Sequence, residues 1–344
     1  GAVEIPKFEL GDVVQWGMAE HFGPGFGFNL EGQRPQAHWL AGRGKGLSYG
    51  LIARAGKMDT RNGLAWSDGI FASPDIGVGQ KVSYERFFAV VPGGVSAVSD
   101  LALILRGDSF GTVRGQVTEL DSRGVVRGAR VNILDRNGKP LTQAETNDKG
   151  EYRMWLAPSE YNVTVDGPGL TPSPSMTVIV TAGETKPLDI AVPPPGEVAF
   201  EILDESGRRI PGKLTFEGVG MTPSPRLGPK YAASGADNVI FCHTGQGKSP
   251  MPPGTYRLVV SRGIEYSVHR QELIVSAGPA ARVQARLVRE VDTTGYVSAD
   301  LHQHCRNSPD SATSLEDRVI SNLCEGVELI VASDHDYLTD FAPV

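Results

Sequence analysis

Residues 128–165 read GARVNILDRNGKPLTQAETNDKGEYRMWLAPSEYNVTV, and this stretch decides the fold of the middle of the chain. Apolar and polar residues alternate within ARVNILD and YNVTVDG, which is the period of a strand with one buried face. Turn-forming residues such as RNGK and NDKG separate the strands at a spacing of about eight to twelve residues. The pattern predicts a small antiparallel β-sandwich.

The same stretch resembles the carboxypeptidase regulatory-like family, a transthyretin-like β-sandwich that is commonly appended to secreted and surface proteins. The resemblance covers residues 111–193. It implies a scaffold module with no chemistry of its own.

The region before this module, residues 1–110, contains aromatic segments such as VVQWG, GFGFNL and YERFFAVV that glycine interrupts repeatedly. No sustained helical period occurs there, so we expect an N-terminal β-sandwich domain. Its aromatic side chains allow two interpretations, a sugar-binding face or a buried core, and the general burial of large aromatics favours the core. These side chains are Trp16, Phe22, Phe26 and Phe28.

The region after the module begins with the proline-rich segment VPPPGE at 192–197, which is typical of a stiff boundary. Residues 194–291 then show the same pattern of short strands separated by turns, and we expect a second Ig- or transthyretin-like sandwich. LAPSEYNVTV in the first module matches MPPGTYRLVV in the second in the placing of its turn and tyrosine. The second sandwich is therefore expected to repeat the architecture of the first.

Residues 292–344 change to the pattern of one βαβ unit: YVSADLHQH as a strand, SLEDRVISNLCEG as a helix and VELIVASDHD as a second strand. Ser314 is a suitable N-cap with Asp317 three residues on, and Gly326 suits the end of the helix. Both strands are short and nearly all apolar, as parallel strands covered on both faces are. The fold prediction is therefore a mainly β chain of tandem sandwiches, followed by the start of an α/β domain.

Histidines and carboxylates gather at the ends of these two strands. His302 and His304 lie two residues apart, so on a strand both imidazoles project from one face and can hold one ion, and Asp300 has the same parity. The second strand ends in SDHD, which puts Asp334 and His335 at its carboxyl end, where parallel barrels place catalytic groups. An isolated HxH is more often chance or structural, but the joint pattern indicates a metal site.

The two motifs, DLHQHCRNSPDS and GVELIVASDHD, resemble the first two motifs of the polymerase-and-histidinol-phosphatase (PHP) family, whose distorted β/α barrel holds two or three metal ions. The wider string from PPGTYRLVVSRGIEY to SDHDYLTDFAP is similar to the carbaryl-hydrolase-like branch, in which β modules precede the metallohydrolase domain. The resemblance implies four metal ligands and two supporting residues. The ligands are His302, His304, Asp310 and His335, and the supporting residues are Asp300 and Asp334.

Imidazoles mixed with carboxylates suit zinc, manganese or iron, and clustered cations acidify a bound water into a nucleophile. The expected activity is hydrolysis of a small-molecule phosphoester, or of a carboxylic or carbamic ester or amide. The alternative is a surface protein that binds carbohydrate or protein through its sandwiches, with the PHP segment serving only as structure. The family barrel continues past the point equivalent to Val344, so we expect the remainder of the PHP domain to be missing and the isolated chain to be inactive.

The composition argues against several other classes of function. Lys and Arg total 33 against 40 Asp and Glu, a net charge of −7, so no broad basic field exists to bind nucleic acid. No segment approaches the roughly 20 apolar residues that cross a bilayer. The three cysteines form no CxxC pair, and Cys242 with its neighbour His243 would point to opposite faces of an extended segment, which argues against a metal site there. The family resemblance implies a periplasmic or extracellular location.

Overall fold

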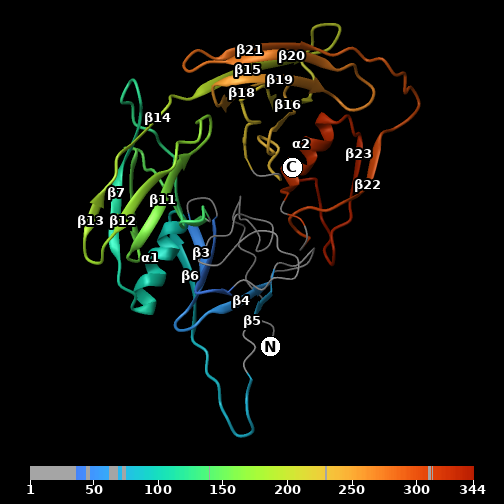
Figure 1. Cartoon of the computed structure of the whole chain (residues 1–344). Helices are drawn as coiled ribbons and strands as arrows, with labels where there is room; N and C mark the ends of the chain where they lie inside the picture. The colour runs from blue at the N-terminus through green and yellow to red at the C-terminus, as the bar shows by residue number, and fades with distance from the viewer. Residues whose placement is uncertain are drawn as a thin grey trace. The chain divides into compact units, whose positions relative to one another are not determined.

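The computed structural model describes residues 36–43, 47–61, 69–71, 75–138, 140–228, 231–308, 311 and 313–344. They belong to two compact units, one formed by residues 1–166 with 172–191 and the other by 167–171 with 192–344. Strands dominate the described chain, which confirms the mainly β prediction (Figure 1). Neither described helix, of 12 and 10 residues, is long and apolar enough to span a membrane. The predicted domain boundaries stay predictions, and the aromatic cluster from Trp16 to Phe28 lies outside the described residues.

The first unit begins with two three-stranded sheets, in the orders β1-β4-β5 and β2-β3-β6. A helix follows them, α1 (Val95–Arg106), in a region where the sequence showed no sustained helical period. Val95, Val98 and Ala102 recur at helical spacing and are buried against the second sheet, whereas the neighbouring Leu and Ile residues mask that period in the sequence. The strands are β1 (Gln36–Ala37), β2 (Trp39–Arg43), β3 (Leu47–Ala53), β4 (Met58–Arg61), β5 (Gly69–Phe71) and β6 (Arg86–Pro92).

The first sandwich occupies the rest of this unit and confirms the prediction made from residues 128–165. One sheet has the order β10-β7-β13, with β14 also on β7, and the other has the order β12-β11-β8-β9. Val131, Ile133, Val163 and Val165, the alternating apolar residues of the quoted stretch, are fully buried. The strands are β7 (Gly111–Glu119), β8 (Arg130–Leu134), β9 (Pro140–Glu145), β10 (Glu151–Leu156), β11 (Ser159–Asp166), β12 (Met176–Val180), β13 (Thr185–Pro187) and β14 (Ile190–Val192).

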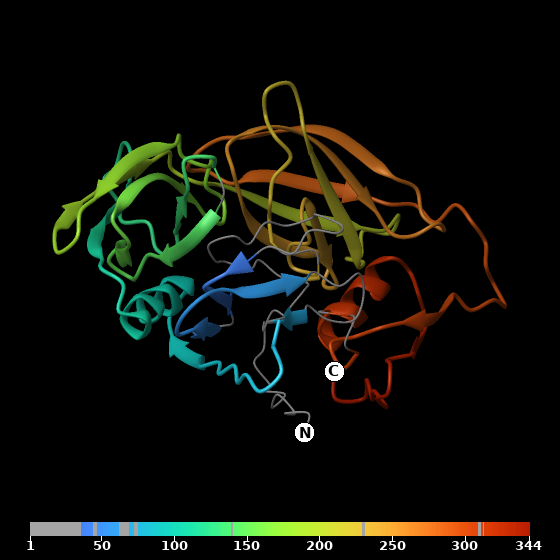
Figure 2. The ribbon, with the colours of Figure 1, turned by 60° about the horizontal axis from the view of Figure 1, so that its bottom comes forward.

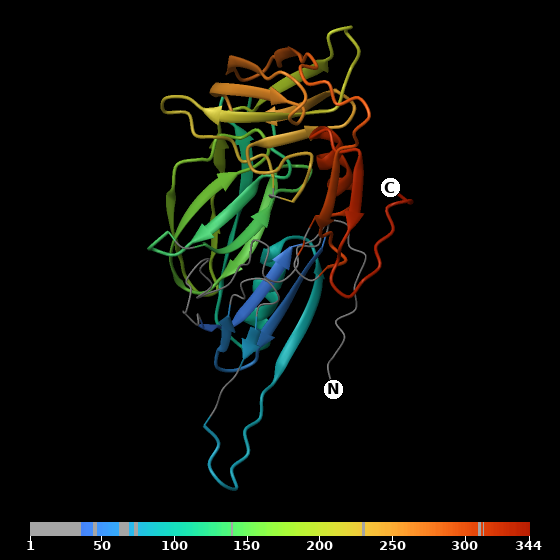
Figure 3. The same cartoon turned by 90° about the vertical axis from the view of Figure 1, so that its right-hand side faces the viewer.

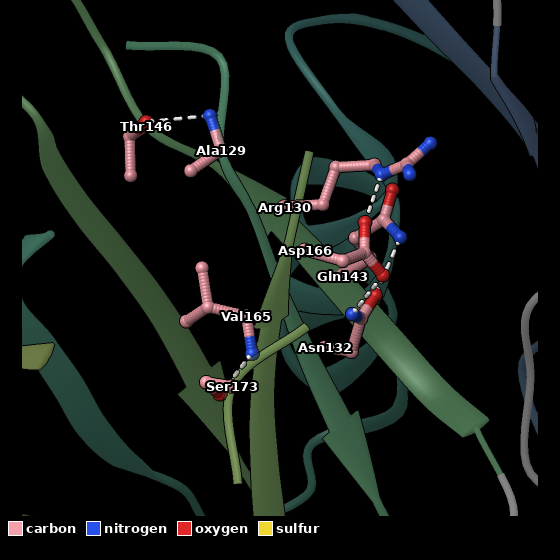
Figure 4. Close-up of polar contacts among 8 residues, drawn as sticks. All are labelled: Ala129, Arg130, Asn132, Gln143, Thr146, Val165, Asp166 and Ser173. Carbon is pink, nitrogen blue, oxygen red and sulfur yellow. Dashed lines mark hydrogen bonds and ion pairs between the residues drawn. The ribbon is translucent and has the colours of Figure 1, made fainter. Parts of the chain in front are cut away.

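Polar side chains tie the strands and loops of this sandwich together (Figure 4). Asp166 on β11 forms an ion pair with Arg130 and accepts a hydrogen bond of 2.9 Å from the Asn132 amide, both on β8. Thr146 is buried, and its hydroxyl accepts the Ala129 N–H at 2.9 Å while donating to the Val126 carbonyl at 2.7 Å. These bonds satisfy main-chain groups of the turn before β8 that would otherwise be buried without partners.

The second sandwich has the same strand order as the first, so the expected repeat of architecture is confirmed. Its sheets run β18-β15-β21, with β21 parallel to β15, and β17-β16-β19-β20. Tyr161 and Tyr256 occupy equivalent places, and each hydroxyl donates at 2.8 Å to the main-chain carbonyl four residues before it. The strands are β15 (Gly196–Leu203), β16 (Gly212–Gly218), β17 (Val239–Cys242), β18 (Gln246–Met251), β19 (Gly254–Ser261), β20 (His269–Val275) and β21 (Ala281–Arg286).

The last element is the predicted βαβ unit: β22 (Ala299–Gln303), α2 (Leu315–Cys324) and β23 (Leu329–Ala332), with β23 parallel to β22. Ser314 caps the helix by accepting the Asp317 N–H at 3.0 Å, and Gly326 follows it with a positive φ of 75°, as predicted. The expectation of two fully covered strands is wrong for the described residues. Leu301, Leu329 and Val331 are 64%, 50% and 40% exposed, because α2 covers one face of the pair only.

In the first unit, α1 is held to the first sandwich by a buried carboxylate. Asp100 accepts the Trp155 N–H at 2.7 Å and lies 3.6 Å from the Arg153 guanidinium, both on β10. Burial raises the pKa of Asp100 to about 6, against the opposing effects of that hydrogen bond and of Arg153. Protonation is therefore easier in the folded than in the unfolded chain, so the contribution of this carboxyl to the free energy of unfolding is largest at low pH and is lost as pH rises through about 6.

We predict that Asp100→Asn removes this pH dependence while keeping an oxygen acceptor for the Trp155 N–H. Each pKa unit corresponds to about 1.4 kcal/mol, so the wild-type helix should lose protection relative to the variant between pH 4 and pH 7. Hydrogen exchange of residues 95–106, compared between the two proteins at matched pH, measures this. Parallel profiles across that range would contradict the assignment.

We also predict that Thr146→Val lowers the free energy of unfolding of the first sandwich by about 1–3 kcal/mol, because the buried Ala129 N–H loses its acceptor. Thr185→Val, at an exposed threonine of β13, is the matched control and should change it by less than about 0.5 kcal/mol. Urea denaturation of the full chain gives both values. Equal effects of the two substitutions would show that the Thr146 contacts contribute nothing specific.

Candidate metal centre

The parallel pairing of β22 with β23 places the carboxyl ends of both strands at one edge. Ala299 pairs with Leu329 and Gln303 with Ala332, with a register shift between these pairs. His302 and His304 lie at the end of β22, and His335 follows β23. Figure 3 shows the two strands side by side in red, so the predicted histidines arrive at the edge where parallel α/β sheets bind ligands.

The three imidazoles are neighbours. The Nε2 atoms of His302 and His304 are 3.2 Å apart, and their ring centroids are 5.2 Å apart. The ring of His335 meets that of His304 edge-on, with 4.7 Å between centroids and an interplanar angle of 79°. His304 thus lies between the other two, and the expectation that the two motifs meet in space holds for these histidines.

The separation of the first two histidines fits metal ligands. Two imidazole nitrogens bound to one tetrahedral zinc ion at about 2.0–2.1 Å lie roughly 3.3 Å apart. The observed 3.2 Å is close to that value, and it also suits a hydrogen bond between a protonated and an unprotonated nitrogen. Among the described residues no set of three His, Cys, Asp or Glu side chains has the geometry to hold an ion, and Asp310 lies outside the described residues. The described part thus supplies an imidazole pair with a third imidazole beside it.

The two supporting carboxylates contact the main chain around the histidines. Asp300 accepts the His302 N–H at 3.1 Å. Asp334 accepts the Cys305 N–H at 2.5 Å through one oxygen and the Thr339 hydroxyl through the other. Asp334 therefore connects the segment after β23 to the segment after β22, and the supporting role proposed for both carboxylates stays a prediction.

Sequence reasoning missed the residues through which α2 holds this site. Arg318 on α2 donates from Nη2 to the His304 carbonyl at 2.8 Å. Asn322, one turn later, donates to the Gln303 side chain at 2.7 Å, and both amides are buried. Strand parity does not signal this contact: Gln303 is buried against α2 whereas Leu301, two residues earlier, is exposed, and the register of β22 shifts between Asp300 and Gln303.

The cysteines and the remaining histidines of this unit lie outside the imidazole cluster. Cys305 is fully buried, and burial, followed by the Asp334 carboxylate, raises the pKa of its thiol above the ordinary value. Burial likewise raises the pKa of Cys324, on α2, to about 12. Cys242 faces the core of the second sandwich whereas His243 is exposed, as expected for neighbours in an extended segment.

Comparisons with known proteins identify one module. Residues 112–193 match the family described as "Carboxypeptidase regulatory-like domain", the family that this stretch of the sequence was found to resemble. The match does not extend to residues 292–344, and the resemblance of that segment to the PHP family stays a prediction. No curated protein matches the chain.

Several solved structures show a low similarity to the chain. The Bacillus anthracis TIE protein is 14% identical at a TM-score of 0.24, over 76% of this chain and 44% of that one. A streptococcal ancillary pilin is 12% identical at a TM-score of 0.30, over 75% and 81% of the two chains, and the Streptococcus agalactiae minor pilin GBS52 is 13% identical at 0.30, over 56% and 100%. The chain thus spans less than half of the TIE protein.

Proposed function

We propose that the chain carries the amino-terminal part of a metal-dependent hydrolase of the PHP type. The observation that carries the proposal is the 3.2 Å separation of the His302 and His304 imidazoles, with His335 against them, at the carboxyl edge of parallel strands. His302, His304, Asp310 and His335 would hold divalent ions, with zinc, manganese or iron suited to this donor set. A bound ion of this kind would supply the Lewis acidity that lowers the pKa of water.

The residues around the histidines have the properties such a site needs. Asp300 and Asp334 fix main-chain groups beside the ligands, and Arg318 fixes the His304 carbonyl, so the imidazoles are oriented before an ion arrives. The exposed apolar residues Leu301, Leu329 and Val331 form a face that further strands and helices of a β/α barrel would cover. We therefore propose that the remainder of the PHP domain is needed for turnover, that the substrate is a small phosphoester, ester, carbamate or amide, and that the protein acts in the periplasm or outside the cell.

A second candidate, a surface protein that binds carbohydrate or protein, is favoured by the β modules. The family match reaches one of these modules, residues 112–193, and does not reach the histidines, so the comparisons support this candidate better than they support hydrolysis. The first sandwich also has an open hollow of about 610 Å³ over the paired strands β7 and β10 and the neighbouring β13. Its lining carries both charges, positive from Arg114 and Arg153 and negative from Glu145, Glu151 and Asp189, together with the neutral amides Gln116 and Asn147.

The two candidates differ in what removal of a histidine does. We predict that the full chain binds Zn²⁺, and that His302→Ala and His335→Ala each weaken binding by more than about tenfold, the lower limit seen when even an outer-shell partner of a metal ligand is lost. His243→Ala, at an exposed histidine of the second sandwich, is the matched control and should bind as the wild type does. Calorimetric titration with Zn²⁺ measures all four proteins.

Equal Zn²⁺ affinity in the wild type and in both site variants would contradict the metal-site proposal. In that case the second candidate would gain, and titration of the chain with soluble glycans and peptides would be the next test, with Arg114→Ala as the variant at the hollow.

A further inference from the structure

The second sandwich contacts α2 at both of its ends. Near the amino end, the Ala233 N–H of the sandwich donates to the Asp317 carboxylate at 2.8 Å. At the carboxyl end, Arg262 donates from Nη1 to the Leu323 carbonyl at 2.9 Å and to the Pro211 carbonyl at 3.0 Å, so one guanidinium joins the helix to the sandwich. A cation at the carboxyl end of a helix also complements the helix dipole.

An ion pair and a close main-chain approach complete this contact. Lys213 on β16 pairs with Glu325, and both side chains are partly buried. Gly263 has a φ of 57°, and a Cβ built on it would lie 2.0 Å from the Glu325 carbonyl oxygen. No side chain fits between the two segments, so the end of α2 lies directly against the sandwich main chain. Figure 2 shows this helix in red near the strands of the second sandwich.

The same helix also contacts the end of β22. Arg318 donates to the His304 carbonyl, and Asn322 donates to the Gln303 side chain. A ten-residue helix is too short to be stable alone, and an isolated pair of strands is marginal at best. The core of the second sandwich, with sixteen buried residues, is therefore what fixes α2.

We propose that the second sandwich is a positioning element of the candidate metal centre: through the Ala233, Lys213, Arg262 and Gly263 contacts it fixes α2, and α2 fixes the His302–His304 pair. This inference rests on the proposed function for its metal, but the mechanical link from sandwich to strand end does not. None of these residues touches the ion or a substrate. They act on the site through the helix.

The test compares Gly263→Ala with Gly278→Ala in the full chain. Both glycines have positive φ, 57° and 92°, so both substitutions carry the same kind of backbone strain. Only at Gly263 does the new Cβ meet α2, because Gly278 has nothing within 4 Å. We expect Gly263→Ala to speed hydrogen exchange of residues 299–304 in metal-free protein, and to weaken Co²⁺ binding at least fivefold with a weaker tetrahedral d–d absorption. Gly278→Ala should change neither.

Lys213→Met provides a second disruption that adds no strain, and Lys213→Arg should restore the wild-type values. If Gly263→Ala does not fold, the lysine variants decide. Wild-type exchange of residues 299–304 and wild-type Co²⁺ affinity in Gly263→Ala and Lys213→Met would overturn the inference. If the wild type itself binds no Co²⁺ at His302, the proposed function fails, and the exchange of residues 299–304 still decides whether the sandwich fixes the strand end.

Discussion

The parallel pairing of β22 with β23 is the constraint on which the candidate site depends. Parallel strands require a crossover, here α2, and they finish at one edge, so two histidine motifs some thirty residues apart in sequence meet there. An antiparallel pair would have separated His302 from His335 by the length of a strand. The metal hypothesis and the places of the two supporting carboxylates follow from this pairing.

The alternation of apolar and polar residues was sufficient to predict the two sandwiches. Alternation in residues 128–165 predicted a sandwich whose inward valines and isoleucines are fully buried, and the matching tyrosine segments predicted a repeat that the strand orders confirm. Parity predicted that His302 and His304 share a face. Each of these inferences needs only the period of a strand and the direction of its side chains.

Tertiary contacts were beyond sequence reasoning because no local period encodes them. Arg262, Arg318 and Asn322 act on partners 14 to 61 residues away, and in sequence they read as ordinary polar surface residues. The helix α1 was missed because apolar residues are not confined to its buried face: Leu101 and Leu105 pack at the edge of the core, whereas Ile104 is exposed, and together they hide the helical period. The strands β22 and β23 were expected to be covered on both faces, but one face is exposed. Apolar composition alone does not reveal how much of a face is covered.

The central claim is that the imidazoles at this strand edge are metal ligands, and X-ray absorption at the zinc edge of the Zn²⁺-loaded full chain tests it most directly. The account predicts at least two imidazole nitrogens at about 2.0–2.1 Å from zinc, with the multiple-scattering signature of histidine rings, and loss of that signature in His302→Ala. A zinc shell of oxygen and sulfur alone, or an imidazole shell unchanged in His302→Ala, would contradict it.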